Sequence, residues 1–297
     1  LLISRLSVAV FFPCTLWLMF VCGQKLGGMP GAWAALLLTA SNAFILLHTR
    51  RAMAESGLLF FSVLSITCIF KLRDHNWLCA IPVALAINAK QSAAPLILVA
   101  LIVLFWPDTK RLIRQRLLDM GKCSLLFALI FFLFNPVFWA HPALSIQAAI
   151  SARSDLLARQ VQELSAQNPA LLLSTPSERT AGMIAQLYFT PLAYYDVGNY
   201  ILATEAEISQ YQAIGLHHVF RNYAGGVLLI VLEISAVFMT MRNIIKLKNR
   251  DQTLALTGLL LSAAFVILAF PIPFQRYYLP VLPWGILISS VLFKPLL

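Results

Sequence analysis

The sequence predicts an all-α protein, a polytopic bundle of membrane-spanning helices. Hydrophobic residues make up 60% of the 297 residues and charged residues only 11%, against about 25% charge in a typical soluble domain. The mean hydropathy is +0.81, and apolar runs of about 15–20 residues recur along the chain, close to the length of a membrane span. These runs show no regular alternation of apolar and polar residues, which favours helices over a β-barrel.

About nine apolar segments are candidates for membrane-spanning helices. A helix rises about 1.5 Å per residue, so about 20 apolar residues cover the hydrocarbon core of a bilayer. The segments are 6–22, 31–47, 54–70, 77–89, 91–106, 123–140, 223–241, 253–270 and 279–295. We expect them to cross in alternating directions, which assigns every connector to one of two sides.

Membrane topology explains the positive charge of the chain. The net charge of +10 sits largely in short connectors between apolar runs, so we expect no nucleic-acid partner. Alternate connectors hold most of the basic residues, and the positive-inside rule places that set in the cytoplasm. The set consists of Lys25, Lys71, Arg73, Lys110, Arg111, Arg114, Arg116, Lys122, Arg242, Lys246, Lys248, Arg250 and Lys294.

Residues 77–106 allow two interpretations. At about 1.5 Å per residue they reach about 45 Å, which is short for two full crossings. One long tilted helix would bury Lys90 and reverse the orientation of everything that follows, placing the basic connector 107–122 outside. Because the charge rule opposes this outcome, we predict two short legs that turn at the sequence NAKQS, with Lys90 at the outer surface.

Four charged residues then lie on the outer side in short connectors. Arg50, Arg51 and Glu55 share one connector, and Lys90 is in the next. Basic residues at these places oppose the topological rule, so they need an acidic partner or an anionic ligand. Arg51 and Glu55 could simply pair, because they are four residues apart on a helix. Lys90 could equally extend its amine to the membrane surface.

A further outer connector, PIPFQRYYLPVLPW at 271–284, contains Arg276 and Tyr277 among prolines. The planar guanidinium of arginine presents donors in a fork that fits phosphate oxygens. A tyrosine beside it offers a flat face and a hydroxyl group. An interfacial anchor, with aromatic rings at the lipid headgroups and a snorkelling arginine, explains the same residues equally well.

Residues 141–221 form the one long polar segment, also on the outer side. The stretches SIQAAISARSDLLARQVQEL and ATEAEISQYQAIGLHHVFRN have helical spacing, and Pro169 and Pro176 separate them. We expect short amphipathic helices on the outer membrane surface. The chain therefore divides into N-terminal membrane helices at 1–140, an outer region at 141–221 and C-terminal membrane helices at 222–297.

Few other residues are candidates for chemistry. Glu233 interrupts the apolar run VLLIVLEISAVF, where an ionised carboxylate is costly, so we favour a polar contact inside the bundle over proton coupling. His141 follows the end of an outer span. The five cysteines show neither metal-ligand spacing nor a disulfide framework.

Four of these stretches together resemble the polyprenyl-phosphate-dependent glycosyltransferases of the GT-C fold. They are similar in particular to family 39, which includes protein O-mannosyltransferases and aminoarabinose transferases. The stretches are RRAMAESGLLFF, INAKQSAAPL, NPVFWAHP and RYYLPVLP. They are spread from about residue 30 to about residue 285, in the same order and on the same membrane side as in the family.

The resemblance implies an enzyme that transfers a sugar, with inversion, from a polyprenyl-phosphate donor. The acceptor would be a lipid, a polysaccharide or a protein outside the cytoplasm, and we expect the bacterial inner membrane. The implied donor-phosphate ligands are Lys90, Arg276, Arg50 and Arg51, and the implied pocket residues are Tyr277, His141 and Gln91. Glu55 would take the family's acidic position as a catalytic candidate.

One departure from the family concerns the main catalytic acid. Such enzymes carry an acidic residue in the first outer loop, where it acts as a base or binds metal. The chain opens inside an apolar run without an initiator Met, so we expect that loop to precede Leu1. No cofactor is implied with certainty, and a role for a divalent metal stays open.

Two other classes of function are alternatives to a transferase. A proton-coupled transporter or lipid flippase would use Glu233 as its proton site. A non-catalytic remnant would only pack against partner membrane proteins and would bind no lipid phosphate. The sugar, the acceptor and the polyprenol are not specified by the sequence.

Overall fold

The computed structural model describes residues 8–50, 54–72, 75–106, 112–169, 172–194 and 201–294, and these residues confirm the all-α fold class. The described residues form helices and connectors without a strand. The helices, with η for short 3-10 or π helices, are α2 (Phe11–Ala40), α3 (Ala43–Arg50), α4 (Ala54–Lys71), η1 (Asn76–Cys79), α5 (Ala80–Ala89), η2 (Gln91–Ala93), α6 (Pro95–Phe105), α7 (Ile113–Leu133), η3 (Pro136–Phe138), α8 (Pro142–Gln167), α9 (Pro176–Ile184), η5 (Ala185–Phe189), α10 (Ile201–Gln212), η7 (Gly215–His218), α11 (Tyr223–Leu247), α12 (Arg250–Ala269), η8 (Gln275–Val281), α13 (Leu282–Ser290) and η9 (Val291–Phe293).

Helix α2 consists of two legs that fold back on each other at Gly28. Gly28 has φ +69° and ψ −162°, a conformation that is essentially restricted to glycine. A Cβ atom at Gly23 would lie only 2.6 Å from the Cβ of Ala35, although a straight helix would separate these residues by about 18 Å. The rings of Phe20 and Trp33 likewise lie 5.3 Å apart. The two sides of this hairpin correspond to the described part of the predicted segment 6–22 and to residues 31–40 of the predicted segment 31–47.

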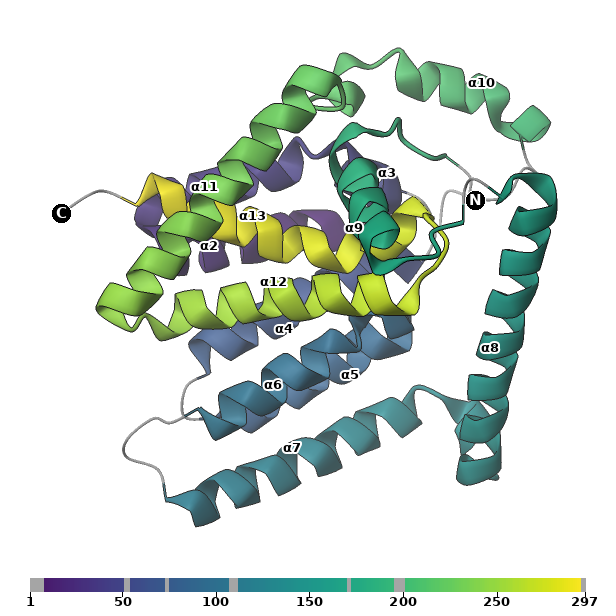
Figure 1. Ribbon diagram of the computed structural model, residues 1–297. Helices are drawn as coiled ribbons and strands as arrows, with labels where there is room; N and C mark the ends of the chain where they lie inside the picture. Colours follow the sequence, from purple (N-terminus) through teal and green to yellow (C-terminus); the bar gives the residue numbers. More distant parts are fainter. Residues whose placement is uncertain are drawn as a thin grey trace.

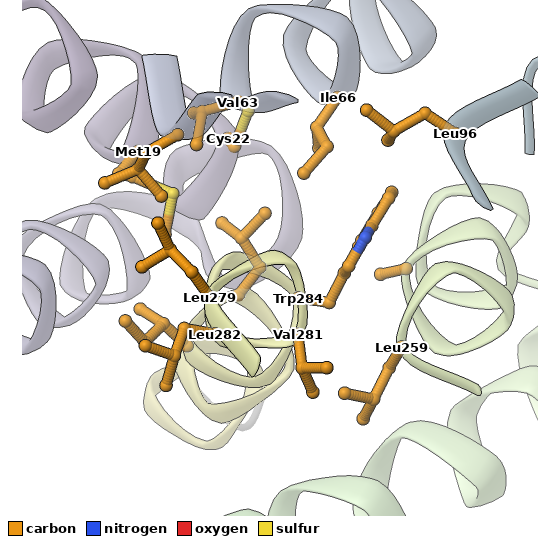
Figure 2. Packing of buried hydrophobic residues seen from close by; sticks show 14 of the residues in the cluster. Met19, Cys22, Val63, Ile66, Leu96, Leu259, Leu279, Val281, Leu282 and Trp284 are labelled. Atoms are coloured by element: carbon orange, nitrogen blue, oxygen red, sulfur yellow. The ribbon is translucent and has the colours of Figure 1, made fainter. Parts of the chain in front are cut away.

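Helix α13 occupies the centre of the bundle. Its residues from Leu282 to Ser290 are all buried, and it packs against α2, α11 and α12. Figure 2 shows Trp284 of α13 pointing toward Leu96 of α6, with Met19 of α2 on another side of the same cluster. Since lipid tails are as apolar as these side chains, close packing rather than avoidance of water holds such helices together.

Nine complete membrane spans are not supported. Among the described residues, four helical stretches are long and apolar enough to cross a membrane: Ala54–Lys71, Tyr223–Leu247, Arg250–Ala269 and Gln275–Phe293. A fifth is added if α2 and α3, which are bent by 62° relative to each other, count as one span. The remaining expected segments are helical but do not qualify, because α5 and α6 are short and the first half of α7 is charged.

The turn predicted between two short legs at residues 77–106 is confirmed. Helix α5 ends at Ala89, and Lys90 has extended backbone angles of φ −163° and ψ 134°. Pro95 then begins α6 at a position that favours proline. Ala80 and Leu104 share one buried cluster, so the two legs run side by side in opposite directions.

The bundle has two ends of different character (Figure 1). At one end α8 stands across the direction of the bundle helices, and α9 and α10 lie on the same side. Helix α8 is 26 residues long, longer than the short helices expected in this segment. It ends at Gln167 before Pro169, and Pro176 begins α9, so the two prolines separate helices as predicted.

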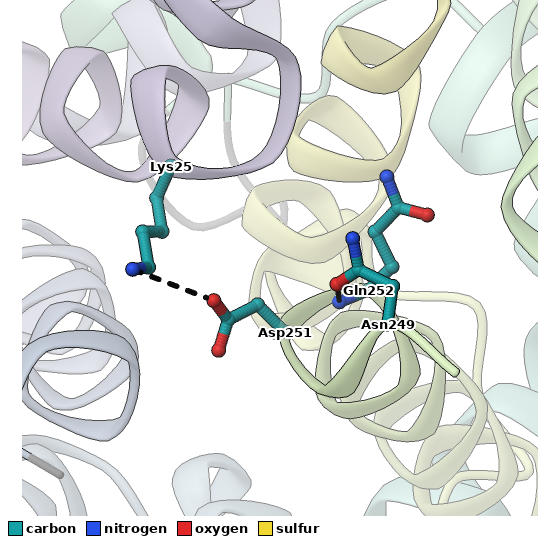
Figure 3. A network of polar contacts seen from close by, with 4 residues as sticks. All are labelled: Lys25, Asn249, Asp251 and Gln252. Carbon is teal, nitrogen blue, oxygen red and sulfur yellow. Dashed lines mark hydrogen bonds and ion pairs between the residues drawn. The ribbon is translucent and has the colours of Figure 1, made fainter. Parts of the chain in front are cut away.

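At the opposite end, α4, α11 and α13 finish and α7 and α12 begin. Lys25, near the turn of the α2 hairpin, lies 3.6 Å from Asp251 in the first turn of α12 (Figure 3). Asn249 caps α12 by accepting a hydrogen bond from the backbone N–H of Gln252 at 3.1 Å. We call this part of the molecule the basic end, because most of the basic connector residues follow or precede these helix termini.

Candidate functional site

A cleft of about 870 Å³ opens at the end of the bundle that faces α8. Its walls come from the start of α4, the turn between α5 and α6, the C-terminal parts of α7 and α12, the start of η8, and α8. The volume lies within the range of about 300–1,000 Å³ that is usual for small-molecule sites. Charged, polar and aromatic side chains that are distant in sequence meet here.

The first charged pair in the cleft joins two helix ends. Lys90 Nζ donates a hydrogen bond of 2.7 Å to Glu55 Oε1. The Glu55 side chain is 3% exposed and the Lys90 side chain 21% exposed. Glu55 lies in the first turn of α4, where the helix dipole favours a negative charge. The carboxylate therefore holds the lysine at the rim of the cleft, with its amine still reachable from solvent.

Three cationic side chains surround the ring of Tyr277. The Lys90 amine lies 5.6 Å from the ring centre, and the guanidinium groups of Arg153 and Arg276 each lie 5.9 Å from it. Cations within about 6 Å of an aromatic ring are attracted to its face. Because like charges repel, three cations gathered around one ring favour a site that receives an anion.

The connector from Phe270 to η8 fixes Arg276 and Tyr277 in place. The Tyr277 ring stacks on Phe270 with ring centres 4.4 Å apart, and the residue is only 3% exposed. Gln275 turns away from the cleft and holds the segment at 190–193: its amide donates to Thr190 Oγ1 at 3.0 Å and accepts from the backbone N–H of Ala193 at 2.8 Å. The predicted anchor sequence is thus split between structural and cleft-facing side chains.

Neutral polar groups complete the lining. Asn135 donates a hydrogen bond of 2.6 Å to Asn88 and so joins the ends of α7 and α5. Ser92 Oγ, on a residue that is 3% exposed, and Gln160 Oε1 have no hydrogen-bond partner in the described part of the chain. Both residues line the cleft. Unsatisfied polar groups in such a place are suited to the hydroxyl groups of a ligand.

The structure brings together five of the eight site residues expected from the sequence: Glu55, Lys90, Gln91, Arg276 and Tyr277 all line the cleft. His141 does not line it, because it lies just before α8 as an exposed residue. The side chain of Arg50 and the whole of Arg51 lie outside the described residues.

Sequence reasoning missed several residues of the cleft, among them Arg153, Asn88, Ser92 and Asn135. Arg153 was one charge among several on an amphipathic stretch, and nothing in its neighbourhood distinguished it from Arg159. Asn88, Ser92 and Asn135 carried a weaker signal, since each is a polar residue at the edge of an apolar run. A polar residue at the end of a membrane helix indicates a functional site more strongly when it faces a cleft than when it faces lipid.

A separate, small cavity of about 50 Å³ lies inside the bundle and contains Glu233. The Glu233 carboxylate accepts a hydrogen bond from the Tyr188 hydroxyl. Arg221 lines the same cavity, and its Nε and Nη2 have no partner among the described residues. Burial lowers the pKa of Arg221 to about 10, so this guanidinium is still charged at neutral pH.

Among the described residues, no three His, Cys, Asp or Glu side chains lie close enough together to hold a metal ion. The described residues that line the cleft offer one carboxylate, three cations and several hydroxyl and amide groups. This set of groups is suited to binding an anionic ligand that also carries hydroxyl groups.

Comparison with known proteins adds no family assignment to this geometry. The chemistry of the cleft therefore has to be argued from its own residues. Neither a family model, nor a curated protein, nor a solved structure matches the chain.

Proposed function

We propose that the protein is a membrane glycosyltransferase that moves a sugar from a polyprenyl-phosphate donor to an acceptor on the non-cytoplasmic side. The observation that carries this proposal is the group of three cations around Tyr277 in a cleft at one end of an apolar helix bundle. The resemblance of four sequence stretches to family 39 transferases supports the same assignment, and all four contribute residues to the cleft.

The cations would act on the leaving phosphate. In the proposed step, an acceptor oxygen attacks the anomeric carbon, and the bond from that carbon to the phosphate oxygen breaks. The phosphate oxygen keeps the electron pair, so negative charge grows where Lys90, Arg153 and Arg276 gather. Cations that already stand where charge develops are the largest single source of rate enhancement in many enzymes.

The acceptor must lose a proton in this step, and Glu55 is the one carboxylate that lines the cleft among the described residues. It already accepts a hydrogen bond from Lys90. We therefore assign Glu55 first to positioning Lys90, and we expect the general base to come from the outer loop that the family carries after its first span.

The lipid part of the donor would lie against the aromatic wall of the cleft. Phe131 of α7, Phe138 of η3 and Phe265 of α12 line this side. Phe131 and Phe138 stack with ring centres 5.6 Å apart. A prenyl chain is apolar and unsaturated, so it gains contact with such rings while its phosphate remains among the cations.

The orientation in the membrane follows from the charges. The basic end would face the cytoplasm by the positive-inside rule, which puts the cleft, α8, α9 and α10 on the outer side. The bacterial inner membrane is the location we propose. The acceptor, whether lipid, polysaccharide or protein, would reach the cleft from the aqueous phase or along the membrane surface.

The proposal can be tested by measuring how the purified full chain in detergent binds undecaprenyl phosphate. We expect Arg153→Gln and Arg276→Gln each to weaken binding at least about tenfold, which corresponds to loss of one charge-assisted contact of about 1.4 kcal/mol or more. The matched control is Arg159→Gln, an exposed arginine on α8 that does not line the cleft. Binding that is unchanged in both cleft variants would exclude the phosphate site.

A proton-coupled transporter is the second candidate, and the half-buried Glu233 in its cavity is the observation that favours it. In that case Glu233→Gln would abolish pH-dependent uptake or lipid movement in proteoliposomes, and Arg276→Gln would leave it intact. A chain that binds no lipid phosphate and moves no substrate would instead be a non-catalytic partner of other membrane proteins.

A further inference from the structure

We propose that a groove at the basic end is a binding site for an anionic phospholipid. The groove has a volume of about 650 Å³ and lies between the last turns of α11 and the η9 segment after α13. It is at the opposite end of the bundle from the cleft. The inference does not depend on the transferase assignment, because it uses different residues.

Three cations line this groove. Arg242 and Lys246 are four residues apart on α11, so they share one face at adjacent turns. Lys294 approaches from the end of the η9 segment. None of the described residues that line the groove is acidic. Within the described chain, no carboxylate lies within ion-pair distance of any of the three.

Two other basic residues near this end have acidic protein partners. Lys25 pairs with Asp251 at 3.6 Å (Figure 3). Lys122 pairs with Asp119 at 3.8 Å and lies over the ring of Trp77. The groove is distinguished by three cations that meet in one hollow without a carboxylate among its described lining residues.

The apolar part of the groove determines the class of ligand. Phe238, Leu247 and Leu292 line it beside the cations. Phe238 is 73% exposed and Leu247 is 66% exposed, so the groove opens directly onto the apolar outer face of α11. A free phosphate would contact only the cations, whereas a phospholipid would place its phosphate on them and its acyl chains along this face.

Physical precedent supports this pairing of groups. Basic pockets between membrane helices on the cytoplasmic side bind acidic lipid headgroups, and basic residues near an anionic membrane surface are attracted to it. Arginine adds a fork of donors that suits phosphate oxygens. A phosphatidylglycerol molecule satisfies both the charge and the apolar contact.

The test is lipid retention by the full chain in non-ionic detergent, measured by native mass spectrometry with phosphatidylglycerol or phosphatidylcholine added. The groove variant is Arg242→Gln, Lys246→Gln and Lys294→Gln combined. The matched control removes the same number of charges near the same end but outside the groove: Lys71→Gln, Arg114→Gln and Lys248→Gln combined. Melting temperatures of both variants establish that they are folded.

We expect the wild type and the control variant to retain phosphatidylglycerol in preference to phosphatidylcholine. In the groove variant, the ratio of retained phosphatidylglycerol to retained phosphatidylcholine should be at least about tenfold lower. Equal retention by the two variants would overturn the site. Equal binding of both lipids by the wild type would also overturn it. Displacement of phosphatidylglycerol by inorganic phosphate at similar concentration would assign the groove to a soluble anion and contradict the lipid proposal.

Discussion

Lys90 Nζ lies 2.7 Å from Glu55 Oε1, although 35 residues of chain separate them. Glu55 lies in the first turn of α4 and Lys90 follows the last residue of α5, so the pair fixes two helix ends at the rim of the cleft. The lysine amine also lies 5.6 Å from the centre of the Tyr277 ring. Lys90 thus connects α4 and α5, through its ion pair with Glu55, to the η8 segment, through its contact with the Tyr277 ring.

Removing one partner of this pair should destabilise the protein more than removing both. Lys90→Met leaves the nearly buried Glu55 carboxylate without its cation, and we expect a loss of about 1–3 kcal/mol, less than for a fully buried pair because Lys90 is partly exposed. Adding Glu55→Gln should recover most of the loss. Thermal unfolding of the single and double variants in detergent measures this coupling, and additive losses in the double variant would contradict it.

Some features of the cleft could be read from the sequence because their signals are local. The sequence NAKQS places polar residues between two apolar runs, and that interruption predicted the break at Lys90. Prolines around QRYY marked a connector between two apolar runs, and residues 270–274 do separate α12 from η8. In both cases neighbouring residues in the sequence determine where the helix breaks, so the break could be predicted without knowledge of the tertiary structure.

Other features depend on contacts that the sequence does not express. Hydropathy marks where apolar residues are, but it does not show that α2 turns back at Gly28. Arg153 and Arg159 lie on the same helix with the same charge, and only the position of α8 beside the bundle brings Arg153 to Tyr277. The asparagine pair of α5 and α7 is likewise a product of packing.

The hairpin at Gly28 gives a second prediction. Because its backbone conformation is open almost only to glycine, Gly28→Ala should cost about 1–3 kcal/mol of stability. Gly121 is the matched control: it lies in the middle of α7, and a Cβ atom there would meet no other atom within 4 Å. Gly121→Ala should therefore leave the melting temperature unchanged or raise it, since alanine favours a helix. Equal melting temperatures for the two variants would contradict the hairpin.

The N-terminus of α9 predicts a pH dependence. Backbone N–H groups of Thr175 and Ser174 donate to the Glu178 carboxylate at 3.0 and 2.7 Å, and they hold the pKa of Glu178 below its usual value of 4.5. A group whose pKa is lowered by folding contributes stability above the unfolded pKa, and this contribution is lost as the pH falls through the folded pKa.

The difference in stability between the wild type and Glu178→Gln should therefore be constant at neutral pH and shrink toward zero below about pH 4.5. Hydrogen exchange of the α9 amides between pH 7 and pH 3, corrected for the intrinsic rate, measures it locally. Arg179, which donates to the carbonyls of Ile267 and Leu268, keeps α9 attached to α12 in both proteins. A difference that grows on acidification would contradict the capping role.

The last prediction concerns the hydrogen bond from Tyr188 to Glu233 inside the bundle. Burial, and then the neighbouring carboxylate, raise the pKa of Tyr188, so its hydroxyl stays protonated and remains a donor. Tyr188→Phe removes that donor from a half-buried carboxylate, and we expect a loss of about 1–3 kcal/mol. Glu233→Gln keeps an acceptor oxygen for Tyr188 and should cost less.

Tyr223→Phe is the control for the tyrosine, because Tyr223 is 80% exposed. Glu207→Gln is the control for the carboxylate, since Glu207 is exposed on α10. If the contact is structural, Tyr188→Phe lowers the melting temperature and leaves undecaprenyl phosphate binding at the cleft intact. Glu233→Gln could instead remove that binding without loss of stability. The small cavity and the cleft would then work as one site, and the assignment of a purely structural role to Glu233 would be wrong.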